Sequence, residues 1–189
     1  MDTPIIKASL PLRRETALKL RAGDLVELSG VVYTARDQAH KRLIKAIEAG
    51  ETLPIALSDQ TIYYAGPAPG RSDQIIGSIG PTTSSRMDAF TPRLLAAGVR
   101  ALIGKGDRSQ MVVNAIKENV AVYFITTGGA AAYLSQFIQR ANIVAWPELG
   151  PEAIYKLDVK NFPAVVAIDS RGENIFNRNK KPYILESNE

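Results

Sequence analysis

The sequence predicts an α/β fold, and two observations carry this prediction. Short apolar segments rich in valine, isoleucine and tyrosine alternate with segments whose apolar residues recur at helical spacing. Such alternation of strands and helices is typical of α/β architecture. The chain has 189 residues, of which 46% are hydrophobic, and this is enough to bury one sizeable core. We therefore expect a single domain over residues 1–189, with a polar tail after about residue 182 that frays.

The expected strands are apolar runs bounded by glycine, proline or polar residues. The first, Asp24–Tyr33, is interrupted by Gly30. The second, Thr61–Ala65, is closed by a Gly-Pro turn. The remaining strands are expected at Ala101–Ile103, Val120–Ile125, Asn142–Trp146 and Val159–Asp169.

The expected helices lie between these strands. Ala35–Ala49 has apolar side chains at helical spacing, and Gly50 supplies its stop signal. A second helix is expected at Ser85–Ala97, where a glycine follows. Two more are expected at about residues 109–118 and 129–139. The segment 66–80, rich in glycine and proline, is either a linker between lobes or an ordered loop beside an active site.

Composition excludes several classes of function. The chain has no cysteine, so disulfides, thiolate nucleophiles and zinc ribbons are excluded, and the chain cannot ligate an iron–sulfur cluster alone. Its single histidine, His40, excludes a multi-histidine metal site. No apolar run approaches the roughly 20 residues that cross a bilayer, and no signal-peptide core is present, so we expect a cytoplasmic protein. The net charge of +4 comes from scattered cations without interleaved aromatics, which favours a solvated face or a small-anion site over nucleic-acid binding.

The segment GPTTSSRMDAF places four hydroxyl residues before a predicted helix whose first turn carries Arg86. Free N–H groups at a helix start, hydroxyl groups and a guanidinium together suit a carboxylate or a phosphate. A purely structural alternative is a capping box between Ser85 and Asp88, which needs no ligand. The capping box leaves Thr82, Thr83 and Arg86 unexplained, so an anion site and a cap both remain open.

The segment YTARDQAHKR contains the end of the first expected strand and the start of the first expected helix. Arg36 and His40 are four residues apart and share a helix face at the rim of the sheet, where α/β proteins bind ligands. Thr34 and Asp37 match a second capping box, so Asp37 has a structural interpretation as well. His40 has one too, as a hydrogen-bonded helix residue.

Two glycine-containing turns follow later strands. LIGKGDR presents Lys105 at a strand end, but the spacing of a nucleotide-binding P-loop is missing. TTGGAAA enters a predicted helix, and its small residues favour close backbone packing over a second anion site. Three cations and a hydroxyl cluster without metal ligands are typical of half an active site.

Four blocks of the sequence resemble one enzyme family in order along the chain. They are LRAGDLVELSGVVYTARDQAHKRL, IYYAGPAP, GPTTSSRMDAFTPRLLAAGVRALIGKG and YFITTGGAAAYL. Together they resemble class I fumarases and L-tartrate dehydratases, from about Leu10 to about Pro182. The chain length resembles that of the separate β subunit, which corresponds to the C-terminal domain of the single-chain enzymes.

The resemblance implies a swivelling β/β/α three-layer fold and a partner α subunit that carries a [4Fe–4S] cluster. This partner would explain why the present chain lacks cysteine. In the family, the open iron of the cluster binds the substrate as a Lewis acid, and a base acts on the adjacent carbon. The β part supplies cations for the substrate carboxylates and a catalytic threonine. We expect the isolated chain to be inactive, and its partner-facing surface to allow self-association.

The resemblance carries particular roles to particular positions. The catalytic threonine is the first of the pair in GPTT, Thr82, and the lysine of GKG is Lys105. The arginine clamps for the carboxylates are Arg36 and Arg86.

Three further residues complete the expected site. Thr83 is expected to bind substrate, and Asp37 and His40 to support it. The family usually has glycine immediately before the second arginine clamp, whereas this chain has Ser85. A serine fits there if the backbone is not left-handed.

Three functions remain open at this point. Reversible hydration of fumarate to malate leads, and dehydration of L-tartrate by the same residues is its nearest alternative. A non-catalytic anion-binding or assembly module is an alternative of another class. The combination of Arg36, Thr82, Arg86 and Lys105 argues against a module that has lost its activity.

Overall fold

Five parallel strands form the larger part of the sheet. The computed structural model describes residues 4–70 and 74–180, and everything below concerns these residues. The five strands pair in chain order, each with the next. They are β1 (Ile6–Leu10), β2 (Leu25–Thr34), β3 (Thr61–Tyr63), β4 (Ala101–Gly104) and β5 (Val122–Ile125).

A long antiparallel strand closes the sheet into a small barrel. Strand β7 (Ile154–Ile168) pairs with β5 at one edge and with β2 at the other. Val165 lies opposite both Leu25 and Ile125, so the ring β2–β3–β4–β5–β7 is continuous. Strand β6 (Ile138–Ala145) pairs with β7 outside this ring. Closure leaves the ring strands without an open edge.

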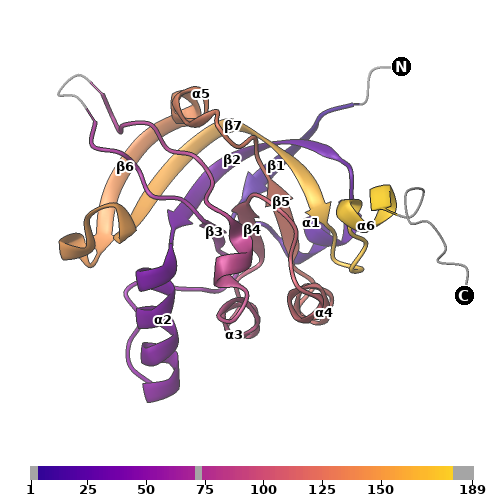
Figure 1. Cartoon of the computed structure of the whole chain (residues 1–189), viewed down its shortest axis with the longest axis horizontal. Coiled ribbons are helices and arrows are strands. Elements are labelled where there is room, and N and C mark those ends of the chain that lie inside the picture. The colour runs from indigo at the N-terminus through magenta and orange to yellow at the C-terminus, as the bar shows by residue number, and fades with distance from the viewer. Residues whose placement is uncertain (1–3, 71–73, 181–189) are drawn as a thin grey trace, which may run out of the picture.

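The alternation of side chains along each strand divides the core in two. On β3, Tyr63 packs inside the barrel, whereas Ile62 faces a second cluster under the helices. Figure 1 shows α2, α3 and α4 on one side of β3, β4 and β5, with β2, β6 and β7 arching over the other side. The bounds of these helices are α2 (Asp37–Ala49), α3 (Thr91–Ala96) and α4 (Gln110–Glu118).

The remaining helical pieces are short. They are α1 (Arg14–Lys19), η1 (Ser84–Met87), α5 (Ala131–Leu134), η2 (Ser135–Phe137), η3 (Pro147–Glu152) and α6 (Ile175–Lys180). No helix in the described ranges is long and apolar enough to cross a membrane.

Most expected elements are confirmed, and α2 most fully. The residue that caps its C-terminus, Gly50, has a φ of 65°, a left-handed conformation that residues with a side chain rarely adopt. The glycine therefore ends the helix where the sequence predicted. Helix α4 and strands β2, β3, β4 and β5 also lie where they were expected. The mixed strand and helix content agrees with the α/β prediction.

Two predicted helices are wrong in extent. The helix expected at Ser85–Ala97 is two pieces, η1 and α3, separated by Asp88, Ala89 and Phe90. The helix expected at 129–139 ends early, because residues from Ile138 onward pair with β7. Here strand pairing overrides local helical spacing.

The structure also contains elements that begin outside the predicted ranges. Strand β1 and helix α1 were not predicted, and β7 begins before the expected strand. In the segment 66–80, the Ala68 N–H donates to the Ser78 carbonyl at 2.9 Å, so its described arms lie side by side. This pairing agrees with an ordered loop rather than a linker. The tail after residue 182 lies outside the described residues.

Candidate functional site

The candidate site lies where the carboxyl ends of the parallel strands meet. Residues 34–37 follow β2, residues 64–66 follow β3, and Lys105 follows β4. The segment 81–84 lies across these ends, because the Thr82 N–H donates to the Tyr64 carbonyl at 2.7 Å. The carboxyl edge of a parallel sheet is the usual ligand edge of such folds.

Arg86 is the centre of a polar cluster at this edge. Its Nε and Nη2 bind the two carboxylate oxygens of Asp37 at 3.2 and 2.6 Å. Its Nη1 donates to the Thr82 hydroxyl oxygen at 3.3 Å. The Arg86 side chain is 47% exposed, so its guanidinium remains open to an incoming anion. The structure therefore brings together three of the residues singled out in the sequence.

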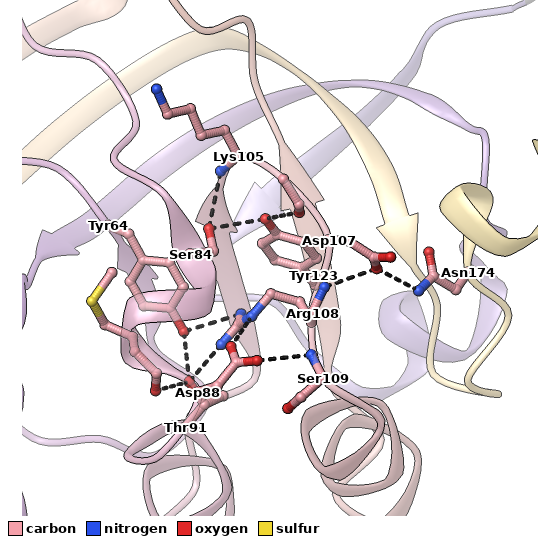
Figure 2. A network of polar contacts seen from close by, with 12 residues as sticks. Tyr64, Ser84, Asp88, Thr91, Lys105, Asp107, Arg108, Ser109, Tyr123 and Asn174 are labelled. Atoms are coloured by element: carbon pink, nitrogen blue, oxygen red, sulfur yellow. Dashed lines mark hydrogen bonds and ion pairs between the residues drawn. The ribbon is translucent and has the colours of Figure 1, made fainter.

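Lys105 joins the same edge through its backbone. Thr83 and Lys105 form a parallel bridge, and the Ser84 N–H donates to the Lys105 carbonyl at 3.0 Å. The Lys105 N–H donates in return to the Ser84 hydroxyl oxygen at 3.0 Å. The lysine side chain then leads away from these contacts (Figure 2). A Cβ placed on Gly128 would lie 3.8 Å from Nζ, so the ammonium lies beside the loop after β5.

Arg36 lies on the neighbouring strand end, as the residue before α2. Its Nη2 is 3.9 Å from a carboxylate oxygen of Glu152, and its buried Nε has no partner in the described structure. A side chain at Gly66 would overlap the backbone of Pro151 and approach Arg36 Cδ to 2.9 Å. Glycine is therefore needed at position 66 to leave room for the arginine.

Both predicted capping boxes are wrong. Thr34 is buried, and its hydroxyl donates to the Ala153 carbonyl at 3.3 Å instead of capping α2. The start of α2 is capped by Glu152, whose carboxylate accepts the Gln38 N–H at 2.8 Å. Asp37 binds Arg86. These partners come from distant parts of the chain, which a local pattern does not contain.

In the second predicted capping box, Asp88 takes other partners. Its two oxygens accept hydrogen bonds from Arg108 Nε and from the Ser109 N–H, each at 2.7 Å. Ser85 lies inside η1, and its φ is not positive. A serine therefore fits at this position without backbone strain. The α-helix expected to begin here starts only at Thr91, so the predicted anion site at an α-helix start is wrong in that detail.

His40 is a core residue and not a group at the rim. It is fully buried, and its ring centroid lies 5.4 Å from Tyr64 and 5.9 Å from Phe90. Nδ1 is 2.8 Å from the Arg36 carbonyl, which only accepts, so Nδ1 carries the proton. Burial lowers the pKa of His40 to about 4, against the hydrogen bond to Arg36, which raises it. His40 is thus neutral near pH 7, and its Nδ1 donates to the carbonyl of Arg36, the residue before α2.

Sequence reasoning missed Arg108, whose charge is buried beneath the site. Its side chain is 0% exposed and pairs with Asp88 at 2.7 Å. Figure 2 shows the two side chains facing each other. The two residues are 20 positions apart, so helical or strand spacing gives no signal for the pair. The only hint was the position of Arg108 shortly after Lys105.

The guanidinium of Arg86 lies on open surface rather than in a closed pocket. A cavity of about 460 Å³ lies next to the site, lined in part by Pro67, Gly150 and Pro151. A second, of about 420 Å³, lies beside Thr126 and Thr127. Neither lining includes Thr82, Arg86 or Lys105. A ligand held by these side chains would thus be exposed on one side unless another surface covers it.

The described residues do not fit a resident iron–sulfur cluster. They contain no group of three or more histidine, cysteine, aspartate or glutamate side chains arranged for a metal ion. The whole sequence lacks cysteine, and its one imidazole is buried with a proton on Nδ1. The donors at the edge are cations and hydroxyls, which suit an anion instead.

Fold and site together define a closed α/β barrel with a cationic edge suited to carboxylates. The chain belongs to the family described as fumarase C-terminus, whose model matches residues 5–179.

Named relatives agree with this assignment. The chain is 38% identical over 179 residues to the putative L(+)-tartrate dehydratase subunit beta of Methanocaldococcus jannaschii, which covers 91% of this chain and 92% of that protein. It is 41% identical over 153 residues to the aerobic class I fumarate hydratase of Salmonella typhimurium, covering 80% of this chain and 26% of that enzyme. It is 34% identical over 175 residues to fumarate hydratase 2 of Leishmania major, covering 92% of this chain and 31% of that enzyme. The chain thus spans about a quarter to a third of these fumarate hydratases and nearly all of the tartrate dehydratase subunit.

Proposed function

We propose that this chain is the β subunit of a two-subunit hydro-lyase that interconverts fumarate and L-malate with a [4Fe–4S] cluster held by the partner α subunit. The observation that carries the proposal is the contact of Arg86 with both Asp37 and Thr82 at the carboxyl edge of the barrel. Family membership supports the reaction class. The open side of the site is where the α subunit would close it, and the isolated chain is then inactive.

Arg36 and Arg86 bind the two carboxylates of the substrate in this proposal. A guanidinium binds a carboxylate through two parallel N–H groups, which fixes orientation as well as charge. Arg86 offers its Nη1–Nη2 edge, because Asp37 occupies the Nε–Nη2 edge. Arg36 offers the outer part of its guanidinium, since its side chain is 26% exposed and its Nη2 is only loosely paired with Glu152 at 3.9 Å. Thr83, exposed beside them, adds a hydroxyl contact to the same substrate.

Thr82 acts as the base on the carbon that bears the departing proton. A threonine hydroxyl is a poor base at its ordinary pKa, so it needs a neighbouring positive charge that favours the alkoxide. Arg86 Nη1, 3.3 Å from Thr82 Oγ1, supplies that charge. Lys105 stabilises the negative charge that spreads onto the substrate carboxylate as the C–H bond breaks. In the hydration direction, the same hydroxyl returns the proton to carbon.

L-tartrate dehydration is the second candidate, and one observation favours it. One relative, covered over 92% of its length, is named a putative L(+)-tartrate dehydratase subunit beta. Fumarate, malate and tartrate are all four-carbon dicarboxylates, so the same pair of arginines would bind each of them. The hydroxyl groups that distinguish them would then be recognised on the partner side.

The proposal also covers architecture and location. The chain forms one domain, and its barrel and helices correspond to the swivelling β/β/α layers of the family. A cytoplasmic location agrees with a thiolate-held cluster on the partner, because thiols stay reduced there. Without that partner, exposed apolar parts of the partner-facing surface can associate with a second copy of the chain.

Anaerobic activity of the α–β complex after cluster reconstitution tests the proposal. Fumarate hydration is expected with both subunits and not with either alone. Thr82→Ala should lower kcat by about 100-fold or more, which is the usual contribution of a positioned base. Thr52→Ala, an exposed threonine on a distant loop, is the matched control and should leave kcat unchanged.

The other outcomes separate the alternatives. Turnover of L-tartrate alone would keep the residue roles and change the substrate. A stable complex with an intact cluster that turns over none of the three acids would reject the enzyme and favour a non-catalytic module. Thr82→Ala activity within a factor of a few of wild type would reject Thr82 as the base.

A further inference from the structure

Arg108 is a buried charge to which the proposed chemistry assigns no part. Its guanidinium lies between two aromatic rings, 5.2 Å from the Tyr64 centroid and 5.0 Å from the Tyr123 centroid. Its Nη2 donates to Thr91 Oγ1 at 2.7 Å, and its Nη1 to the Tyr64 hydroxyl at 3.4 Å. Burying a charged pair is costly, and apolar residues of similar volume often stabilise a core as well or better. Stability alone is therefore a weak reason for this arrangement.

The contacts of Arg108 fix the segment after Arg86. Asp88, two residues beyond Arg86, binds Arg108 Nε with one oxygen and the Ser109 N–H with the other. Thr91 donates to the Met87 carbonyl at 2.8 Å, so its proton is used there. The η1 segment is thereby attached to the start of α4.

The network also fixes the segment before Arg86. The Tyr123 hydroxyl lies 2.9 Å from Ser84 Oγ and 2.8 Å from the Gly106 carbonyl oxygen. Ser84 Oγ in turn accepts the Lys105 N–H. Figure 2 shows this connection running from Lys105 through Ser84 and Tyr123 to the side of the buried guanidinium. The two segments that carry the proposed site residues thus converge on one buried group.

We infer that Arg108 is a positioning residue that sets the separation between the segment carrying Thr82 and Arg86 and the turn carrying Lys105. The inference rests on the proposed function. Arg108 holds the first segment through Asp88. The Tyr123 ring beside it contacts, through its hydroxyl, both Ser84 of that segment and the Gly106 carbonyl of the Lys105 turn, and Arg108 itself touches no substrate. Catalytic groups misplaced by about 1 Å can lose 100-fold in rate, so the effect should fall on kcat.

Arg108→Met removes the charge and the planar fork while keeping an elongated apolar side chain. In the α–β complex it should lower kcat for fumarate by about 10-fold or more, at temperatures where the complex remains folded. Arg108→Lys keeps the positive charge but loses the planar guanidinium. Compared with Arg108→Met, it should therefore recover more of the thermal stability than of kcat. Tyr123→Phe keeps the ring and removes the hydroxyl near Ser84, and it should give a smaller loss of kcat in the same direction.

Arg100→Met is the matched control at the other end of β4. Arg100 directly precedes that strand and pairs with Asp59 through Nε at 3.0 Å and Nη2 at 2.8 Å. Its loss should lower the melting temperature while leaving kcat within about twofold of wild type. A purely structural Arg108 would behave in the same way, so equal kcat values in the Arg100 and Arg108 variants would overturn the inference.

Hydrogen exchange of the complex gives a second readout that needs no turnover. Arg108→Met should speed exchange at the amides of Thr82, Ser84 and Lys105, which donate the hydrogen bonds of the network, and Arg100→Met should not. Unchanged exchange at these amides would overturn the inference. If Arg108→Met cannot be purified, Tyr123→Phe and Arg108→Lys test the same amides. Inactivity of the wild-type complex would count against the proposed function alone.

Discussion

Arg86 and Asp37 are bound to each other by two hydrogen bonds, although 49 residues separate them in the chain. The pair joins the start of α2 to η1 and orients the remaining edge of the guanidinium toward solvent. A substrate carboxylate would therefore meet an arginine whose orientation is already fixed, which lowers the entropic cost of binding.

Asp37→Asn should raise KM for the dicarboxylate by about threefold to tenfold, because Arg86 loses a charge-assisted partner and must be ordered by the substrate. Stability should change by less than about 1 kcal/mol, since both side chains are partly exposed. Steady-state kinetics and thermal melts measure the two effects. Glu48→Gln, an exposed change on the same helix, should alter neither. An unchanged KM in Asp37→Asn would show that Arg86 needs no such anchor.

Lys105→Met should lower kcat by about 100-fold, the usual loss when one donor to a developing negative charge is removed. The melting temperature should hardly change, because the side chain is only partly buried and its backbone hydrogen bonds to Ser84 remain. Lys45→Met on α2 is the control for loss of an exposed positive charge. A rise in KM with normal kcat would instead assign Lys105 to ground-state binding.

His40 should make stability depend on pH. Its pKa is about 4 in the folded chain and near 6.5 when unfolded, so the unfolded state binds the proton more readily between these values. The free energy of unfolding is therefore highest above pH 6.5 and falls as the pH is lowered toward 4. The contribution of His40 to this fall is about 3 kcal/mol.

Urea unfolding at intervals from pH 4 to 7 measures this dependence. His40→Asn keeps a donor near the Arg36 carbonyl but does not titrate, so the difference in slope between variant and wild type isolates His40 from the carboxylates. Parallel curves for the two proteins would contradict the assignment.

Gly104→Ala should disturb the site through Ser84. A Cβ at position 104 would overlap the Ser84 hydroxyl and approach a Tyr64 ring carbon to 2.9 Å. We expect a loss of about 1–3 kcal/mol in stability, as for other overpacked positions, together with a fall in kcat. Gly106→Ala meets no atom within 4 Å and is strained only by its φ of 82°, so it should lower stability and leave kcat closer to wild type. Urea unfolding and kinetics of both variants test the contrast.

The sequence predicts elements well where their stabilising contacts are local. Helix α2 has its periodic apolar face and its stop residue Gly50 within one short window. Helix η1 with α3 was read as one helix, because the bonds of Asp88 to Arg108 and Ser109 come from beyond that window. His40 was placed at the rim for the same reason: spacing gives its helix face, but the aromatic rings that bury it come from other segments.

Closure of the barrel by β7 has a consequence for the order in which the chain folds. The contacts that hold the site edge near Thr34 and Gln38 come from Ala153, Glu152 and Tyr155, more than 110 residues later in the chain. Contacts across such long separations form late, because closing a long loop precedes any gain from pairing. A nascent chain that has reached β5 therefore contains all five parallel strands but lacks the contacts of Glu152, Ala153 and Tyr155 with the residues at the end of β2 and the start of α2. This end of the site is completed only after the last long strand has been synthesised and has joined both sides of the ring.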